Sequence, residues 1–201
     1  MGIVFPALTK ANPRLGRSLI RSLAILLLVV CPLRLSAVEY QSADAFIQQA
    51  FNGNKGTTKV YWVDDHAKQV IESILAHSFN KMRLRYWQQD NETVWILDEI
   101  GKEAPITVGI HIKDQAIVRT KVLVYRESRG DEVRHDFFTD QFKSAKLDDQ
   151  TQLDQHIDGI TGATLSVRAL TKLSRIALWL DNYVTKAEAT KAKVTKAEKS
   201  Q

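Results

Sequence analysis

The chain is poor in the residues that form covalent cross-links and metal sites. Its 201 residues include a single cysteine, Cys31, which lies inside an apolar run near the N-terminus. A lone thiol forms no internal disulfide and no multi-thiolate metal site. The five histidines, at positions 66, 77, 111, 135 and 156, have no spacing typical of metal ligands. The sequence also lacks the Gly-x-Ser-x-Gly, Walker and Gly-x-Gly-x-x-Gly motifs, so it predicts no metal, no catalytic nucleophile of these classes and no such nucleotide-binding loop.

Positive charge is scarce in the central part of the chain, although the net charge is +5. Residues 1–37 carry five basic side chains and no acidic one, and the residues from Thr185 onward carry five lysines against two glutamates. Between these ends, residues 38–184 carry 18 basic and 21 acidic side chains. A protein that docks on a nucleic-acid backbone needs a basic face, so we expect no nucleic-acid partner.

The N-terminal 37 residues are typical of an export signal. Basic residues, among them Arg14, Arg17 and Arg21, precede the apolar run Leu23–Leu33, and the small residues of Leu35-Ser36-Ala37 form a cleavage site. The run is shorter than the ~20 residues that a membrane-spanning helix needs. We therefore expect a signal peptide over residues 1–37 and a periplasmic or otherwise extracytoplasmic protein. An uncleaved membrane anchor and a buried helix of the fold are the alternatives.

The pattern of apolar residues between 38 and 184 predicts a single α+β domain, an antiparallel sheet flanked by helices. Ser42 caps a helix that reaches Phe51, Asp64 or Asp65 caps a second helix, and a third runs from near Ala163 to near Leu180. Four β-rich stretches, Met82–Trp87, Thr93–Leu97, Ile106–Ile112 and Ala116–Tyr125, are joined by short connections, which favours an antiparallel meander.

The last residues, 185–201, form a low-complexity tail. The repeats Thr185-Lys-Ala-Glu-Ala, Thr190-Lys-Ala-Lys-Val and Thr195-Lys-Ala-Glu-Lys have a period of five, which matches neither a helix nor a strand. No continuous apolar stripe forms at this period. We expect a mobile or nascently helical tail without a core of its own.

One segment, Asp158–Ser166, combines small residues with the start of the third helix. Gly162 supplies backbone freedom, Thr161 can cap the helix, and the hydroxyl of Thr164 lies at its first turn. Free N–H groups and the helix dipole favour a phosphate at such a place. Many helices that bind nothing begin in the same way, so the residues alone leave both interpretations open.

The run Asp158-x-x-Thr161-Gly162-Ala163-Thr164 resembles the Asp-x-x-Ser/Thr-Gly-Ala-Thr signature of the FMN-binding domain family. That family includes the C subunit of the sodium-pumping NADH:quinone oxidoreductase and the G subunit of the Rnf complex. In these proteins the last threonine of the signature carries FMN through a phosphodiester bond, which a flavin transferase makes from FAD outside the cytoplasm. The resemblance implies covalent FMN at Thr164, with Ser166 as the hydroxyl residue that often follows two places later.

A second resemblance concerns Tyr125-Arg-Glu-Ser-Arg-Gly130, which is similar to the Glu-Thr-Pro-Gly loop beside the flavin ring in that family. It implies that Glu127 and Gly130 contact the cofactor, although Arg129 replaces the proline. A charged hairpin turn is the alternative interpretation. From their proximity in sequence, we expect Arg126, Arg129 and Arg134 to stabilise the reduced, anionic flavin.

The resemblance implies an electron-transfer flavoprotein with no catalytic side chain of its own. Its partners would be the flavin transferase and membrane-associated electron donor and acceptor proteins. Because the expected mature chain lacks the spanning helix of the two subunits, a soluble or peripheral carrier is favoured. The alternatives are an exported binding or scaffold module of the same fold without flavin, and a domain that delivers electrons to a separate reductase.

Overall fold

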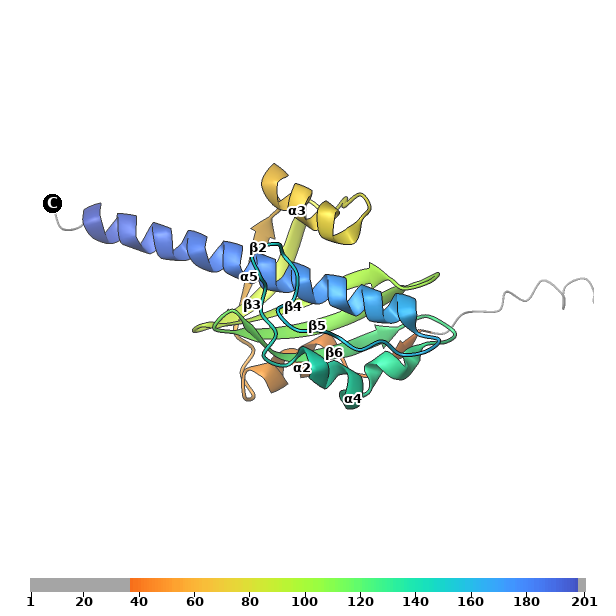
Figure 1. Ribbon diagram of the computed structural model, residues 1–201. Helices are drawn as coiled ribbons and strands as arrows, with labels where there is room; N and C mark the ends of the chain where they lie inside the picture. The colour runs from red at the N-terminus through yellow and green to blue at the C-terminus, as the bar shows by residue number, and fades with distance from the viewer. Residues whose placement is uncertain (1–36, 199–201) are drawn as a thin grey trace, which may run out of the picture. The chain divides into compact units, whose positions relative to one another are not determined.

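The β-rich stretches assemble into one six-stranded sheet in which every neighbouring pair is antiparallel (Figure 1). The computed structural model describes residues 37–198, so almost all of the expected signal peptide lies outside the described residues. The strands are β1 (Val38–Glu39), β2 (Thr57–Trp62), β3 (Arg83–Gln89), β4 (Glu92–Ile100), β5 (Pro105–Lys113) and β6 (Ala116–Tyr125), in the order β1-β6-β5-β4-β3-β2. The predicted meander, β3 to β6, and the α+β class are confirmed.

The sequence interpretation missed the two edge strands, β1 and β2. Strand β1 has only two residues, which is too short for any periodicity to show. In β2 the half-buried residues alternate with exposed ones such as Val60, and two threonines precede them. An edge strand with one partner needs little apolar surface, and its pattern is correspondingly weak.

Helices cover both faces of the sheet. Helix α2 (Ala43–Ala50) begins after Ser42, whose hydroxyl accepts a hydrogen bond from Ala45 N at 3.2 Å. Helix α3 (Asp65–Leu75) is capped by Asp64, which accepts from Ala67 N at 2.8 Å. Both predicted caps are confirmed. A short helical region follows β6: η1 (Asp131–Arg134), α4 (Asp136–Thr139) and η2 (Asp140–Phe142).

The main core lies between the sheet and the C-terminal helix α5 (Thr164–Glu198), which crosses one sheet face in Figure 1. Leu170, Leu173 and Ala177 of α5 are buried there, as the sequence pattern predicted. A smaller core under α2 on the opposite face contains Phe46. At this place the sheet carries Gly109, because a Cβ there would lie 2.7 Å from the Phe46 ring.

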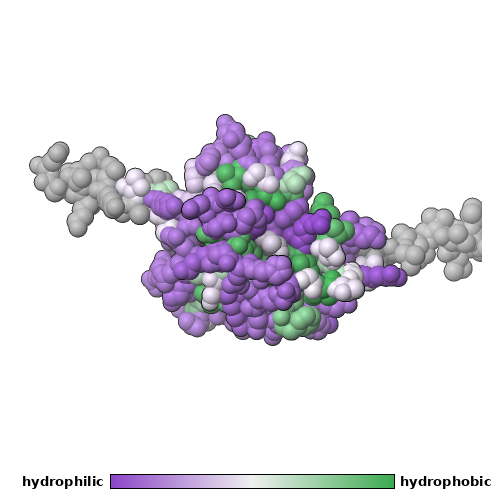
Figure 2. Space-filling model, viewed as in Figure 1, coloured by the Kyte–Doolittle hydropathy of each residue, from purple (hydrophilic) through white to green (hydrophobic). Residues whose placement is uncertain are grey.

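Helix α5 does not end near Leu180, so that predicted boundary is wrong. It continues to Glu198 and extends beyond the sheet in Figure 1. Ala, Lys and Glu have high helix propensities, and no Gly or Pro follows Gly162, so nothing in the sequence stops the helix. The part of the tail next to the sheet is also anchored: Glu188 accepts from Lys59 Nζ at 2.6 Å and from Gln88 Nε2 at 3.1 Å. Figure 2 shows a largely hydrophilic surface along α5, and none of the helices in residues 37–198 has both the length and the hydropathy needed to span a bilayer.

A buried polar chain joins α5 to the middle of the sheet. Trp95 donates through Nε1 to the Thr93 hydroxyl at 3.1 Å, and that hydroxyl donates to the Asp181 carboxylate at 2.6 Å. Burial raises the pKa of the Asp181 carboxyl above its ordinary value of 3.8, and the Thr93 hydrogen bond opposes the shift only in part. Asp181 has no cationic partner among the described residues, so its negative charge is costly in this position.

We predict that Asp181→Asn stabilises the protein at neutral and alkaline pH. The folded state holds the Asp181 proton more tightly than the unfolded chain, so this carboxyl lowers the free energy of unfolding as the pH rises above 3.8. Asparagine still accepts the Thr93 hydrogen bond and carries no charge. Thermal unfolding at pH 8 should show a melting temperature higher by a few degrees, and the difference from the wild type should shrink toward pH 4. An equal difference at both pH values would contradict the prediction.

Candidate functional site

Three loops that are distant in sequence meet beside the start of α5. They enclose a cleft of about 570 Å³, a volume typical of a small-molecule or cofactor site. One loop joins β4 to β5, the second follows β6, and the third leads into α5. The lining residues are Lys102, Glu103, Glu127, Ser128, Arg129, Gly162, Ala163, Thr164, Leu165 and Ser166.

The loop before α5 leaves hydrogen-bond donors at the cleft. It makes a tight turn in which Ala163 N donates to Ile160 O at 3.0 Å, and Gly162 adopts the positive φ of 86° that this turn needs. The first backbone N–H of the helix that donates an i→i−4 hydrogen bond is that of Val167, which donates to Ala163 O at 3.0 Å. The N–H groups of residues 164–166 therefore have no backbone acceptor within the described chain. They lie at the positive end of a 35-residue helix, where an anionic group is stabilised.

Tyr125, the last residue of β6, ties the second loop to α5. Its hydroxyl lies 2.9 Å from the Ser166 hydroxyl and donates to Arg129 O at 2.6 Å. The loop packs closely because residue 130 is glycine: its φ is 85°, and a Cβ there would lie 3.0 Å from the Tyr125 hydroxyl and 3.2 Å from Ser166 Oγ. The two motifs of the sequence analysis thus form one structure.

Glu127 fixes the loop between β4 and β5. Its Oε1 atom accepts from three consecutive backbone N–H groups, those of Lys102, Glu103 and Ala104, at 2.5, 2.7 and 3.0 Å. Desolvation raises the pKa of the Glu127 carboxyl, but these donors and the charge of Lys102 together bring it below its ordinary value. A carboxylate held in this way shapes the cleft wall through the backbone.

The structure brings together most of the predicted cofactor-binding residues. Glu127, Gly162, Ala163, Thr164 and Ser166 line the cleft, and Thr164 is exposed as the first residue of α5. Gly130 lies directly behind them, against Ser166. Ser166 itself is buried, and the hydroxyl it offers is engaged by Tyr125.

Two other predicted residues lie outside the cleft lining. The Asp158 side chain is 83% exposed and lies near His156 Nε2, at 3.6 Å. Thr161 is exposed in the turn and does not cap α5, because the helix begins three residues later, at Thr164. The predicted helix start near Ala163 is confirmed to within one residue, whereas the predicted cap at Thr161 is wrong.

Of the three arginines expected to stabilise reduced flavin, only Arg129 lines the cleft. Arg126 donates through Nη1 to Pro105 O at 3.0 Å and to the Thr107 hydroxyl at 2.9 Å, and Arg134 pairs with Asp131 at 3.0 Å. The Arg126 guanidinium is therefore hydrogen-bonded to β5, and the Arg134 guanidinium is paired with a carboxylate of η1. Lys102 supplies a second cation that the sequence interpretation missed, because its loop lies 25 residues before Glu127 and carries no motif.

We predict that Tyr125→Phe destabilises the protein by roughly 1–3 kcal/mol, since it leaves the buried Ser166 hydroxyl and the Arg129 carbonyl without this partner. Urea unfolding measures the change, and the double variant Tyr125→Phe/Ser166→Ala should recover part of the loss. Tyr61→Phe is the matched control, because the Tyr61 hydroxyl donates to the exposed Asp64 carboxylate. If both variants lowered the free energy of unfolding by the same amount, the hydrogen bonds of Tyr125 would have no special role in stability.

We predict that Glu127→Gln lowers the free energy of unfolding by roughly 1 kcal/mol at pH 7, because hydrogen bonds to a carboxylate are stronger than those to an amide oxygen. The lowered pKa of Glu127 stabilises the folded state above the ordinary value of 4.5, and this contribution disappears as the pH falls. The difference between the two proteins should therefore narrow below pH 4.5. Glu103→Gln in the same loop, whose side chain is 70% exposed, should change little at either pH.

A comparison with protein families agrees with this geometry. Residues 101–178 match the family model for the FMN-binding domain, a segment that begins at the β4–β5 loop and contains every residue of the cleft lining. No curated protein matches the chain. The match to residues 101–178 shows that this part of the chain is similar to the FMN-binding domain, and it supports FMN as the ligand of the cleft.

Proposed function

We propose that the protein is an extracytoplasmic electron carrier whose FMN is linked to Thr164 through a phosphodiester. The observation that carries the proposal is the position of the Thr164 hydroxyl. Thr164 is exposed, lies on the wall of the cleft, and is the first residue of α5, beside N–H groups that have no backbone acceptor among residues 37–198. A phosphate bonded to this oxygen would lie where the helix stabilises negative charge.

The residues present fit the phosphate end of FMN, and two cations lie on the same cleft. The amides of residues 164–166 supply donors for phosphate oxygens, and the space that a Cβ of Gly162 would enter contains no atom within 4 Å. Lys102 and Arg129 line the same cleft, and their positive charges would stabilise the flavin when reduction makes it anionic. Glu127 holds the loop of Lys102 in place through three backbone hydrogen bonds.

Attachment would proceed as a phosphoryl transfer from FAD on a flavin transferase. The Thr164 oxygen attacks the phosphorus of the FMN half, the bond to the AMP half breaks, and AMP leaves while the hydroxyl proton passes to the transferase. The reaction needs no oxidant or reductant. On this chain it needs only an accessible hydroxyl, which Thr164 provides.

Bound FMN supplies two-electron and one-electron redox chemistry, and the protein orients it and sets its potential. In the proposed role Thr164 anchors the cofactor, Lys102 and Arg129 adjust the electrostatic potential, and no side chain acts as a catalytic residue. The donor and acceptor would be membrane-associated proteins. A covalent bond suits a protein outside the cytoplasm, where a lost cofactor cannot be replaced from the cytoplasmic pool.

The export part of the proposal rests on the basic leader and on the apolar run Leu23–Leu33. A covalently attached FMN and an exported chain are separate properties, and each has its own test. For export, protease added to intact cells with a permeabilised outer envelope should digest the protein while a cytoplasmic marker survives. Survival of both would contradict the export of this chain.

We predict that co-expression with a flavin transferase adds the mass of one FMN less one water to the intact protein, and that Thr164→Ala abolishes the addition. Thr164→Ser should restore it at least in part, because serine keeps the hydroxyl. Thr171→Ala is the matched control, because Thr171 is a threonine of the same helix that lies outside both the signature and the cleft lining, and this variant should be modified like the wild type. Unmodified wild-type protein from cells with a working transferase would contradict covalent attachment, as would a modified Thr164→Ala variant.

A further inference from the structure

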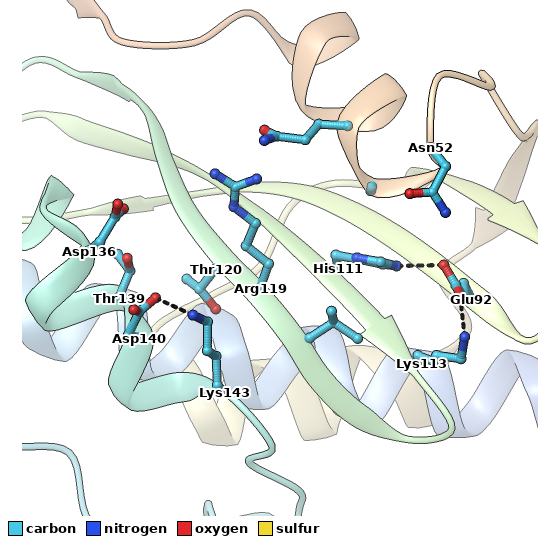
Figure 3. A pocket seen from close by; sticks show the side chains of 13 residues that line it. Asn52, Glu92, His111, Lys113, Arg119, Thr120, Asp136, Thr139, Asp140 and Lys143 are labelled. Carbon is cyan, nitrogen blue, oxygen red and sulfur yellow. Dashed lines mark hydrogen bonds and ion pairs between the residues drawn. The ribbon is translucent and has the colours of Figure 1, made fainter.

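A second cavity, of about 500 Å³, lies between α2, strand β6 and the short helices after β6 (Figure 3). None of the residues that line it lines the flavin cleft. Its lining residues are Gln49, Ala50, Asn52, Glu92, His111, Lys113, Val118, Arg119, Thr120, Asp136, Thr139, Asp140 and Lys143. We refer to this cavity as the β6 groove.

The β6 groove runs along the outer edge of strand β6. Three consecutive residues, Val118, Arg119 and Thr120, line it, although neighbouring side chains of a strand point to opposite faces. In Figure 3 Arg119 extends toward the wall formed by α2, and Lys143 and Asp140 belong to the opposite wall. A cavity bordered by both faces of an outer strand lies along the edge of that strand.

Within residues 37–198, this edge has no strand partner over its middle part. Strand β1 pairs with β6 only at Val124 and Tyr125, and Leu123 O accepts from Tyr40 N at 2.8 Å. At the other end Ile117 N donates to Ala145 O at 3.0 Å. Between these attachments, within the described chain, no backbone hydrogen bond joins residues 118–122 to any segment other than β5. An open strand edge of this kind is a template for a further extended segment.

A buried polar atom lines the same groove without a partner. The Thr120 side chain is 2% exposed, and its Oγ1 atom has no hydrogen-bond partner among the described residues. Nearly all buried hydroxyl groups in folded proteins are hydrogen-bonded. The Thr120 hydroxyl is therefore an unsatisfied buried group beside this edge, and an ordered water would supply its missing partner.

Among the described residues, one cation that lines the groove, Arg119, makes no ion pair, although its charge contributes, after that of Lys121, to the lowered pKa of Asp136. Lys113 pairs with Glu92 at 2.7 Å and Lys143 pairs with Asp140 at 2.9 Å. Lys121, next to the groove, pairs with Asp136 at 2.8 Å. Arg119 has no ion pair and no side-chain hydrogen bond in the part of the chain that the structure describes. A ligand that complements the groove brings one negative group to Arg119.

His111 does not supply a second free cation. It is buried and hydrogen-bonded through Nε2 to Glu92 at 2.9 Å. Burial lowers its pKa below the ordinary value of 6.5, although Glu92 opposes the shift, and the nearby charges of Lys113 and Arg119 lower it further. At neutral pH the unpaired positive charge of the groove is therefore that of Arg119.

We propose that the β6 groove binds an extended, acidic segment of a partner protein, which adds a strand to the open edge of β6 and places a carboxylate on Arg119. In a sheet, the residue directly opposite Arg119 has its side chain on the same face, so an Asp or Glu there meets the guanidinium. The backbone of the segment pairs with residues 118–122. The chain's own leader cannot provide the carboxylate, since residues 1–37 contain no Asp or Glu.

The test selects from a random twelve-residue peptide library with the full chain as bait, and then measures binding of a selected, fluorescently labelled peptide by anisotropy. The selected peptides should contain an Asp or Glu flanked by β-branched residues. The labelled peptide should slow amide hydrogen exchange in residues 118–122. Arg119→Gln should weaken binding about tenfold, the loss expected for one partly buried charge pair, and a Glu-to-Gln peptide should lose a similar amount.

Two controls make the outcome decisive. Lys81→Gln, which removes a surface cation paired with Asp98 outside the groove, should bind the peptide like the wild type. A peptide with N-methylated backbone amides at alternate residues should not bind, because it cannot pair with a strand edge. The proposal is overturned by equal binding of the methylated peptide, by unchanged affinity of Arg119→Gln, or by a selection without acidic residues. The proposal is also overturned if sedimentation shows a dimer and hydrogen exchange shows that residues 118–122 are already protected in it, because the occupant is then a second copy of this chain.

Discussion

The hydroxyl of Tyr125 is the contact through which the sheet and the long helix together form a binding site. It is bonded to the loop that follows β6, at Arg129 O, and to the first turn of α5, at Ser166. The main core brings α5 across the sheet, but burial of apolar area does not fix how the helix is placed along its axis. The polar contacts at Tyr125, together with the close approach of Gly130, fix the position of the helix start against the end of β6. The cleft is the space left beside that junction.

Strand β6 takes part in both binding regions. Its middle residues border the groove that we assign to a partner segment, and the residues after its C-terminal end form one wall of the cleft beside the start of α5. The two regions differ in what they offer a ligand. The cleft presents the amides of a helix start and two cations, which suits a phosphate-bearing cofactor. The groove presents a strand edge and one cation, which suits an extended chain with a carboxylate.

Much of the fold could be predicted because its elements have strong local signals. The caps Ser42 and Asp64, the four central strands and the apolar face of α5 all follow from periodicity and capping chemistry. The motif before α5 contains Thr164, Gly162 and Ala163, and the structure places all three on the wall of the cleft. What could not be predicted depends on contacts between distant segments. Lys102 reaches the cleft only because Glu127 binds its loop, and the helix continues past Leu180 although its later residues carry no apolar stripe.

The anchoring of Glu188 changes where the folded unit ends. By composition alone, the chain divides after Val184, and the remainder is a repetitive segment with no role in the domain. In the structure, Glu188 holds Lys59 of β2 and Gln88 of β3, the two strands at the far edge of the sheet. In the sheet order, β3 and β2 lie on the far side from β6. Helix α5 therefore borders the cleft with its first turn and contacts the opposite edge of the sheet with its seventh turn. A shortened chain that stops at Val184 would keep every cleft residue but would lose the hydrogen bonds of Glu188 to Lys59 and Gln88. Expression designs that remove the repeats should therefore retain at least residues 185–188.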